Sequence, residues 1–154
     1  MVRDMRRSAR ITIPLPPSDA MPWFTPEGER AWAGPHWNPH YPQPDRVVGP
    51  GTVFTTHAHA HTHAGSTVWV MVDHEPTRVR YTRVTPEVQA GMVTVAVVGS
   101  AEHSTTVEVT YDLAALSPSG ADALDRFTEG YDAEIRGWQT AIVQALGTRE
   151  SRGA

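Results

Sequence analysis

The sequence predicts an α+β domain in which an antiparallel sheet packs against one long C-terminal helix. Segments that alternate apolar and polar residues follow one another as far as Leu113, as in consecutive strands. Short connections rich in Gly and Pro join most of them, which is typical of an antiparallel meander. Beyond them, apolar residues recur every three or four positions up to Leu146, which indicates a helix.

The N-terminal third predicts a strand followed by two short helices. Residues 7–15 alternate apolar and polar side chains, and two prolines end this strand. Residues 20–25 and 27–33 each follow capping side chains, Ser18 and Asp19 for the first and Thr25 for the second. Each also has a proline in its first turn, where a missing N–H costs little.

Residues 34–50 are rich in Pro, His and Asn and predict a long loop. The loop contains Trp37 and Tyr41, which a loop exposed only to solvent does not need. We expect these two rings to cover an opening or to pack on a neighbouring subunit.

The middle of the chain predicts five further strands, separated by turn residues. They are expected at residues 52–58, 66–73, 78–85, 92–98 and 105–113.

One continuous helix is expected from the Ser117-Pro118 cap onward. Gly130 and Gly137 lie inside it, and we expect them to allow close approach to the sheet or room for a ligand. We expect a single domain at residues 7–147, between a disordered arm at 1–6 and a disordered tail at 148–154. The apolar stripe of the helix comprises Leu124, Phe127, Tyr131, Ile135, Trp138, Ile142 and Leu146.

The composition excludes several classes of function. The formal net charge of −4 argues against a nucleic-acid-binding protein. The chain has no Cys, which excludes disulfides, thiolate nucleophiles and Cys-ligated zinc, and no Lys, which excludes a Lys Schiff base. Its apolar runs are too short to span a bilayer or to act as a signal sequence. We therefore expect a cytoplasmic protein without a membrane span.

The order of elements and several local motifs resemble the START-like or SRPBCC superfamily, in particular bacterial members similar to polyketide cyclases and heat-shock ATPase activators. The resemblance covers nearly the whole chain. It implies a helix-grip fold, in which a curved antiparallel sheet of about seven strands surrounds a long C-terminal helix, with two short helices after the first strand. It implies no cofactor and no single reaction. The motifs that carry it are residues 25–32, 49–54, 67–70, 80–86, 105–111 and 127–138.

This fold implies an apolar cavity between the sheet and the helix, where aromatic side chains would either contact a ligand or fill the core. Tyr81 and Tyr111 are the strongest candidates, because a buried hydroxyl needs a partner. The full set of candidate ligand-binding residues is Trp23, Phe24, Trp69, Tyr81, Tyr111, Phe127, Tyr131 and Trp138.

Acid–base chemistry in such a cavity would need a titratable group facing it. Tyr81, Arg83, Tyr111 and Asp73 are available, and strand alternation places Arg83 on the same face as Tyr81. A buried Arg is costly unless an anionic ligand or a carboxylate pairs with it. No catalytic residue is assigned, because the sequence contains no Ser–His–Asp, phosphate-loop or dinucleotide-binding signature.

His57, His59, His61 and His63 alternate with small residues and would share one face of an extended strand, about 7 Å apart. Two such imidazoles can bind one transition-metal ion. The stretch, however, lies at an expected hairpin tip, without a nearby acidic residue or Cys to complete a specific site. We expect adventitious metal binding here, and a charge switch below about pH 6.5 is an alternative.

Three functions follow as hypotheses. The first is binding of a small hydrophobic or aromatic molecule, the second a cyclase- or dehydratase-like enzyme, and the third a co-chaperone-like interaction domain. A cavity with His or Arg beside Tyr would favour the enzyme, and a wholly apolar cavity would favour carriage. A homodimer is a further expectation that rests on the resemblance alone.

Overall fold

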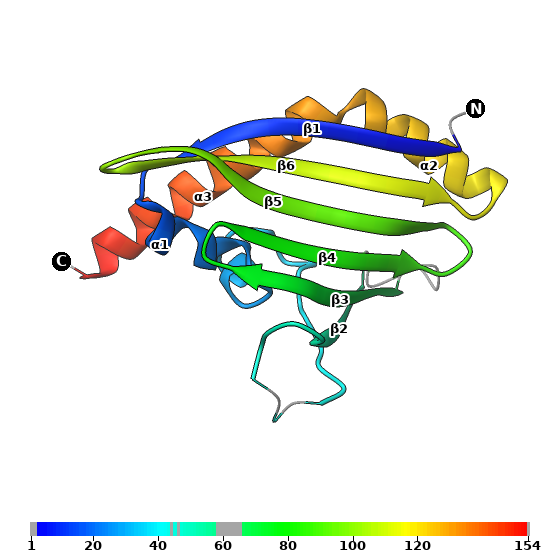
Figure 1. Ribbon diagram of the computed structural model, residues 1–154, viewed down its shortest axis with the longest axis horizontal. Coiled ribbons are helices and arrows are strands. Elements are labelled where there is room, and N and C mark those ends of the chain that lie inside the picture. The colour runs from blue at the N-terminus through cyan, green and yellow to red at the C-terminus, as the bar shows by residue number, and fades with distance from the viewer. Residues whose placement is uncertain (1–2, 44, 46, 58–65, 154) are drawn as a thin grey trace.

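The computed structural model describes residues 3–43, 45, 47–57 and 66–153. Within them, six antiparallel strands form one sheet in the order β1-β6-β5-β4-β3-β2 (Figure 1). Three short helices follow the first strand, and two longer helices end the chain. In sequence the elements are β1 (Asp4–Ile13), α1 (Pro17–Ala20), η1 (Met21–Phe24), η2 (Gly28–Ala31), β2 (Val53–His57), β3 (Ser66–Glu75), β4 (Arg78–Thr85), β5 (Gln89–Ala101), β6 (Ser104–Ala115), α2 (Pro118–Glu129) and α3 (Tyr131–Gly153).

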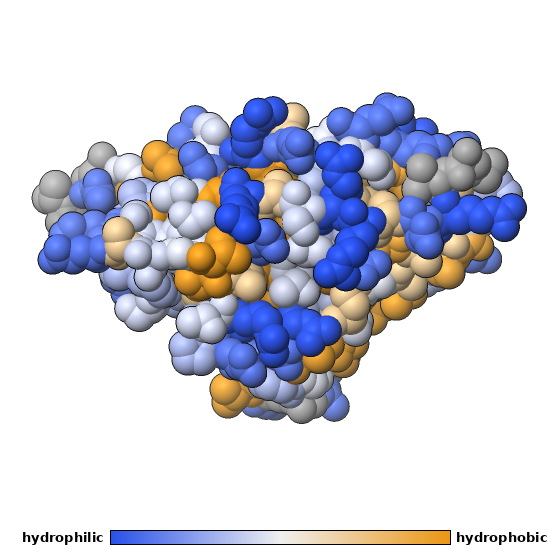
Figure 2. All heavy atoms as spheres, turned by 45° about the horizontal axis from the view of Figure 1, so that its top comes forward, coloured by the Kyte–Doolittle hydropathy of each residue, from blue (hydrophilic) through white to orange (hydrophobic). Residues whose placement is uncertain are grey.

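The helices α2 and α3 lie on one face of the sheet, and α3 runs past β1 and β6 toward α1 (Figure 1). The opposite face carries polar cross-strand pairs, as at Arg6–Asp112 (3.1 Å) and Arg10–Glu108 (3.2 Å). Figure 2 shows hydrophilic residues interspersed with hydrophobic ones across the visible surface. This alternation follows from the period of two along each strand.

Two buried hydroxyls connect the layers. The Tyr131 hydroxyl donates to the Val109 carbonyl at 2.6 Å and joins α3 to β6. The Tyr81 hydroxyl donates to the Phe24 carbonyl at 2.7 Å and joins β4 to η1. Hydrogen bonds of this kind fix how the helices sit on the sheet, because breaking one would leave a buried polar group unsatisfied.

The α+β class and the antiparallel meander are confirmed, but the strand count is corrected from about seven to six. The alternation pattern itself predicted six strands, and the seventh came only from the resemblance. The chain between η2 and β2 forms no strand among its described residues, although an isolated bridge joins His40 to Thr55 of β2.

The single C-terminal helix is a second correction, because it is divided at Gly130 into α2 and α3. Gly130 has φ −96° and ψ 6°, outside the helical region, and its N–H donates back to the Arg126 carbonyl at 3.2 Å. The apolar stripe nonetheless continues through the break, with Leu124, Tyr131 and Ile135 fully buried. Ser117 caps α2 as predicted, since its Oγ accepts from the Gly120 N–H at 3.1 Å.

The element ends also differ from the sequence expectation. The strand β1 begins at Asp4, inside the expected N-terminal arm, and α3 continues to Gly153, beyond the expected end of the domain. The arginines of this segment fit β1 because the exposed face of an antiparallel sheet tolerates charged side chains. No helix among the described residues is long and apolar enough to cross a membrane.

The two short helices after the first strand are resolved as α1 with η1, and as η2. The expected cap Thr25 is corrected, because η2 starts at Gly28 with Glu27 at the cap position and no side-chain cap, although Thr25 Oγ1 accepts from the Gly28 N–H at 3.1 Å. The expected caps Ser18 and Asp19 are wrong, because α1 starts at Pro17 with Pro16 before it and no side-chain cap.

Candidate functional site

A cavity of about 340 Å³ lies between the sheet, α3, η2 and the loop after η2. Every strand except β1 contributes a side chain to its wall. A pocket of this size suits a small molecule rather than a long lipid. The lining residues are Phe24, Glu29, Trp32, Ala33, Trp37, Phe54, Trp69, Tyr81, Arg83, Val93, Val95, Tyr111, Glu134, Gly137, Trp138 and Ala141.

Aromatic rings form two walls of the cavity. On the β2–β4 side, Phe54 and Trp69 stack in parallel with centroids 5.8 Å apart, and Tyr81 meets both rings edge-on. On the α3 side, Trp138 packs at 5.3 Å from Trp32. Flat, rigid walls of this kind favour a flat ligand, because aromatic rings stack or meet edge to face.

The Arg83 side chain extends from β4 into the cavity between these aromatic walls. Its guanidinium carbon lies 5.0 Å from the centre of the Trp69 ring, a cation–π contact. Its Nε is buried without a hydrogen-bond partner among the described residues. Burial lowers the pKa of Arg83, while the nearby Tyr111 opposes that change. An Arg side chain remains protonated under such conditions, so the cavity contains a positive charge.

Glu29 faces the cavity from η2. No ion pair or hydrogen bond joins its carboxyl to another described side chain, and burial raises its pKa well above the ordinary value. The residue keeps some exposed surface, because the space it faces is hollow rather than filled. Burial thus favours the neutral acid, the form that has a proton to donate.

Two tyrosines complete the polar part of the lining. The Tyr81 hydroxyl is occupied by its bond to the Phe24 carbonyl, whereas the Tyr111 hydroxyl has no partner among the described residues. Burial raises the pKa of Tyr111, Arg83 opposes this effect, and Glu29 and Glu134 add to it. Burial is also the main reason that the pKa of Tyr81 is raised. Both phenols therefore stay protonated, and Tyr111 can donate to a ligand.

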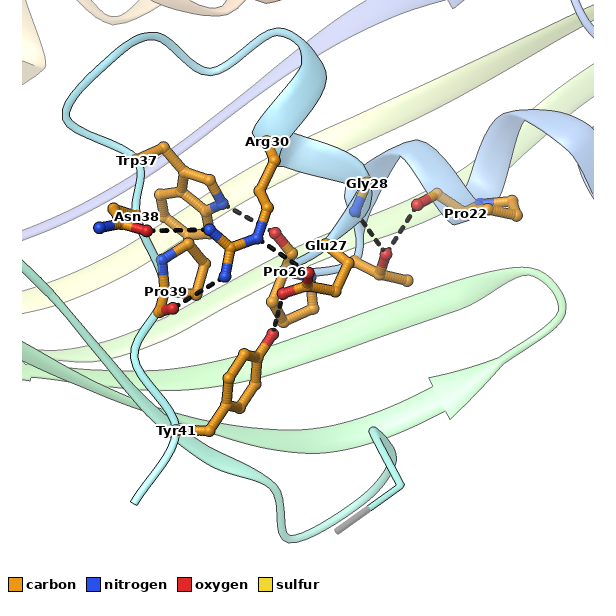
Figure 3. A network of polar contacts seen from close by, with 10 residues as sticks. Pro22, Pro26, Glu27, Gly28, Arg30, Trp37, Asn38, Pro39 and Tyr41 are labelled. Atoms are coloured by element: carbon orange, nitrogen blue, oxygen red, sulfur yellow. Dashed lines mark hydrogen bonds and ion pairs between the residues drawn. The ribbon is translucent and has the colours of Figure 1, made fainter. Parts of the chain in front are cut away.

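The loop after η2 closes one side of the cavity through Trp37, whose ring packs on Phe54 and Trp69. Figure 3 shows how the loop is held: Arg30 donates to Asn38 Oδ1 and to the Pro39 carbonyl, both at 2.9 Å. The Trp37 Nε1 donates to the Pro26 carbonyl at 2.9 Å. This geometry agrees with the expectation that Trp37 covers an opening.

Glu27 anchors the same network. It accepts from Arg30 Nε at 2.8 Å and from the Tyr41 hydroxyl at 2.5 Å (Figure 3). Burial by itself would raise the pKa of Glu27, but the hydrogen bonds from Arg30 and Tyr41 outweigh it and lower that pKa. Glu27 thus remains charged and structural, in contrast to the unpaired Glu29 two residues later.

Five of the eight candidate ligand-binding residues line the cavity: Phe24, Trp69, Tyr81, Tyr111 and Trp138. The other three are not among its lining residues: Trp23 and Tyr131 are buried in the core, and Phe127 packs on Tyr111 at 5.0 Å. Contact of any of them with a ligand stays a prediction.

Sequence reasoning missed Glu29, Trp32 and Phe54. Nothing in the sequence indicated that Glu29 faces the cavity, because an acidic residue in a short surface helix is usually solvated. Phe54 could have been identified from the alternation along β2, because its side chain points to the face opposite that of its neighbours Val53 and Thr55.

Of the four candidate metal ligands only His57 is described, and its Nδ1 lies 3.1 Å from Ser66 Oγ. His59, His61 and His63 lie outside the described residues. Elsewhere in the described part of the chain, no three His, Asp or Glu side chains gather in a way that could hold a metal ion.

No protein-family model and no curated protein sequence matches this chain. Solved structures do match it. Norcoclaurine synthase from Thalictrum flavum, in complex with dopamine and hydroxybenzaldehyde, superposes with a TM-score of 0.65 at 9% identity, covering 93% of this chain and 86% of that one. Ara h 8.0201 matches with a TM-score of 0.67 at 15% identity, covering 94% and 99%.

PFC0360w, an HSP90 activator from Plasmodium falciparum, matches with a TM-score of 0.61 at 16% identity, covering 93% of this chain and 96% of that one. The three proteins share the helix-grip fold of the START-like superfamily, so the resemblance expected from the sequence is confirmed at the level of fold. One of them is a synthase and another an HSP90 activator, and the fold therefore does not choose among the three functions.

Proposed function

We propose that this protein binds a small aromatic molecule in the cavity between the sheet and α3. The observation that carries this proposal is an aromatic-walled space of about 340 Å³ in which Glu29, Arg83 and Tyr111 have no hydrogen-bonding or ionic partner among the described residues. Apolar walls with a few convergent polar groups are typical of ligand pockets, in which the polar groups fix the orientation of the ligand.

The likeness to norcoclaurine synthase supports the choice of an aromatic ligand, because dopamine and hydroxybenzaldehyde are both small aromatic molecules. At 9% identity this likeness concerns the fold only. The properties of the ligand must therefore come from the side chains of this chain's own cavity.

Gly137 provides a direct test. It lines the cavity from α3, and a Cβ at this position would meet no other atom within 4 Å. A Gly137→Leu side chain has an unobstructed Cβ position at the cavity wall, and replacing Gly in a helix favours folding by up to about 1 kcal/mol. We expect the variant to be at least as stable as the natural protein and to bind N-phenyl-1-naphthylamine, a neutral aromatic fluorophore, at least about tenfold more weakly.

The matched control is Gly147→Leu. Gly147 lies on the same helix, also with nothing within 4 Å of an added Cβ, but it does not line the cavity. We expect it to bind the fluorophore like the natural protein in a fluorescence titration. Equal affinities for all three proteins, or no binding to the natural protein, would contradict the proposal.

An acid–base enzyme is the second candidate, favoured by one observation. Arg83 and Glu29, whose neutral form burial favours, share a cavity with Tyr111, which is the arrangement of Arg beside Tyr that we associated with catalysis. A neutral carboxyl can act as a general acid near neutral pH. A molecule that copurifies with the protein is incubated with it and checked for conversion. If it is converted, Glu29→Gln should stop the conversion and leave the affinity for that molecule within about threefold. The reason is that an amide keeps the shape of the carboxyl but has no acidic proton to transfer.

A further inference from the structure

We infer that the ligand of this cavity carries a carboxylate that pairs with Arg83. The inference deepens the proposed function and rests on it. It is based on the Arg83 guanidinium, which faces the cavity and has no acidic partner among the described residues. Neighbouring groups of the cavity wall could hold the rest of an aromatic acid.

The position of Arg83 is fixed by the sheet. Arg83 follows Tyr81 by two residues, so both side chains emerge on the inner face of β4. In the register between β3 and β4 it lies directly opposite Trp69, and the Trp69 ring covers the guanidinium at 5.0 Å. One face of the guanidinium is thereby occupied, while its planar edge, where the N–H groups point, is the part that can meet a carboxylate.

The neighbouring Arg80 has the acidic partner that Arg83 lacks among the described residues. It lies on the same strand but on the outer face, and its Nη1 is 3.1 Å from Asp73 Oδ2. No described carboxylate lies within ion-pair distance of Arg83, and its buried Nε has no acceptor. Burying a charge without a partner is costly, and an anion that enters the site would offset that cost.

The acidic groups of the cavity do not replace such an anion. Glu29 and Glu134 both line the cavity without pairing with Arg83, and Glu134 lies at its exposed side. Burial favours the neutral form of Glu29. A neutral Glu29 and the free Tyr111 hydroxyl are instead donors, suited to the oxygen atoms of a bound acid. The aromatic body of that acid would lie against Trp32 and Trp138.

The experiment compares two ligands of nearly the same shape, 2-naphthoate and the uncharged 2-naphthamide, by calorimetric titration at pH 7.5. A charge-assisted hydrogen bond is worth roughly ten- to a hundredfold in affinity. We expect the natural protein to prefer naphthoate by at least about tenfold. We expect Arg83→Met, which keeps an unbranched apolar stem but removes the charged guanidinium, to lose this preference.

Arg80→Met is the matched control, since it removes an arginine from the same strand on the other face of the sheet; it should keep the preference. Equal affinities of the natural protein for the two ligands would overturn the inference while leaving aromatic binding intact, and this comparison does not depend on any variant folding. A preference that survives in a folded Arg83→Met would overturn it as well. If neither ligand binds the natural protein, the proposed function fails and the inference fails with it.

Discussion

At the scale of single residues, Glu29 has the most informative environment. Its carboxyl is the one acidic group in the described cavity wall whose pKa burial raises well above the ordinary value of 4.5. In the unfolded chain the group ionises near that ordinary value. Between the two pKa values the folded state therefore holds a proton that the unfolded state has released.

This difference sets the sign of a pH effect. Where the folded state binds more protons, the free energy of unfolding falls as pH rises, by at most about 1.4 kcal/mol per pH unit for one group. The contribution of Glu29 to stability is fully present below pH 4.5 and is lost as pH rises through its raised pKa. We expect Glu29→Gln, which cannot ionise, to be as stable as the natural protein near pH 4 and more stable by at least about 1 kcal/mol at pH 8.

Urea denaturation of both proteins at several pH values measures this difference directly. The acidic samples serve as the internal control, because there the carboxyl and the amide are both neutral. A difference in stability that stays constant from pH 4 to pH 8 would show that the Glu29 carboxyl is solvated like a surface group.

At the scale of elements, η2 and the loop after it act together. The loop lines the cavity with Trp37, and Arg30 holds it by two hydrogen bonds, to Asn38 and to the Pro39 carbonyl, while Glu27 holds Arg30 in place. We expect Arg30→Met to free the loop locally at a cost of about 1.4 kcal/mol, which corresponds to about tenfold faster hydrogen exchange. The reporting amides are Trp37, which donates to the Gly34 carbonyl, and His40, which donates to the Thr55 carbonyl.

Arg10→Met is the control for this experiment. Arg10 pairs with Glu108 across β1 and β6 on the outer face, far in sequence from the loop. It should leave exchange at Trp37 and His40 unchanged. If Arg30→Met also leaves these amides unchanged, the loop is held by the packing of Trp37 rather than by the polar network.

The position of η2 itself depends on Gly28. A Cβ at Gly28 would overlap the carbonyl of Pro22, so only glycine lets η2 approach η1 this closely. This approach directs the neighbouring Glu29 toward the cavity, while Glu27 and Arg30 turn toward the loop. A structural glycine thus separates two acidic residues with different roles.

At the scale of the whole molecule, the cavity exists because α3 is held at a fixed place over the sheet. Tyr131 is fully buried at the start of α3, and its hydroxyl bonds to the Val109 carbonyl of β6. We expect Tyr131→Phe to lower the free energy of unfolding by about 1–2 kcal/mol, because the buried carbonyl loses its side-chain partner. Urea denaturation followed by far-UV circular dichroism measures this loss.

Thr148→Val is a matched comparison on the same helix. The Thr148 hydroxyl also donates to a main-chain carbonyl, that of Gln144 at 3.1 Å, but it is exposed. Its removal should change stability by less than about 0.5 kcal/mol. A Tyr131→Phe variant with an equally small effect would mean that packing alone positions α3.

The sequence by itself determined the class of the fold and most of its elements. Strand alternation and the helical stripe depend on residues that are near neighbours in the chain, so they can be read without knowing the tertiary structure. The same alternation correctly placed Arg83 on the face of Tyr81, since both line the cavity. The cap at Ser117 was an equally local signal.

Only the tertiary structure decided where α3 begins and which side chains meet in the cavity. Neither the break at Gly130 nor the inward turn of Glu29 has a periodic signal in the sequence. Glu29 and Arg83 are 54 positions apart in the printed sequence, yet they line one cavity. Their chemistry follows from burial and from the absence of a partner within the described structure, and both of these arise only when the chain has folded.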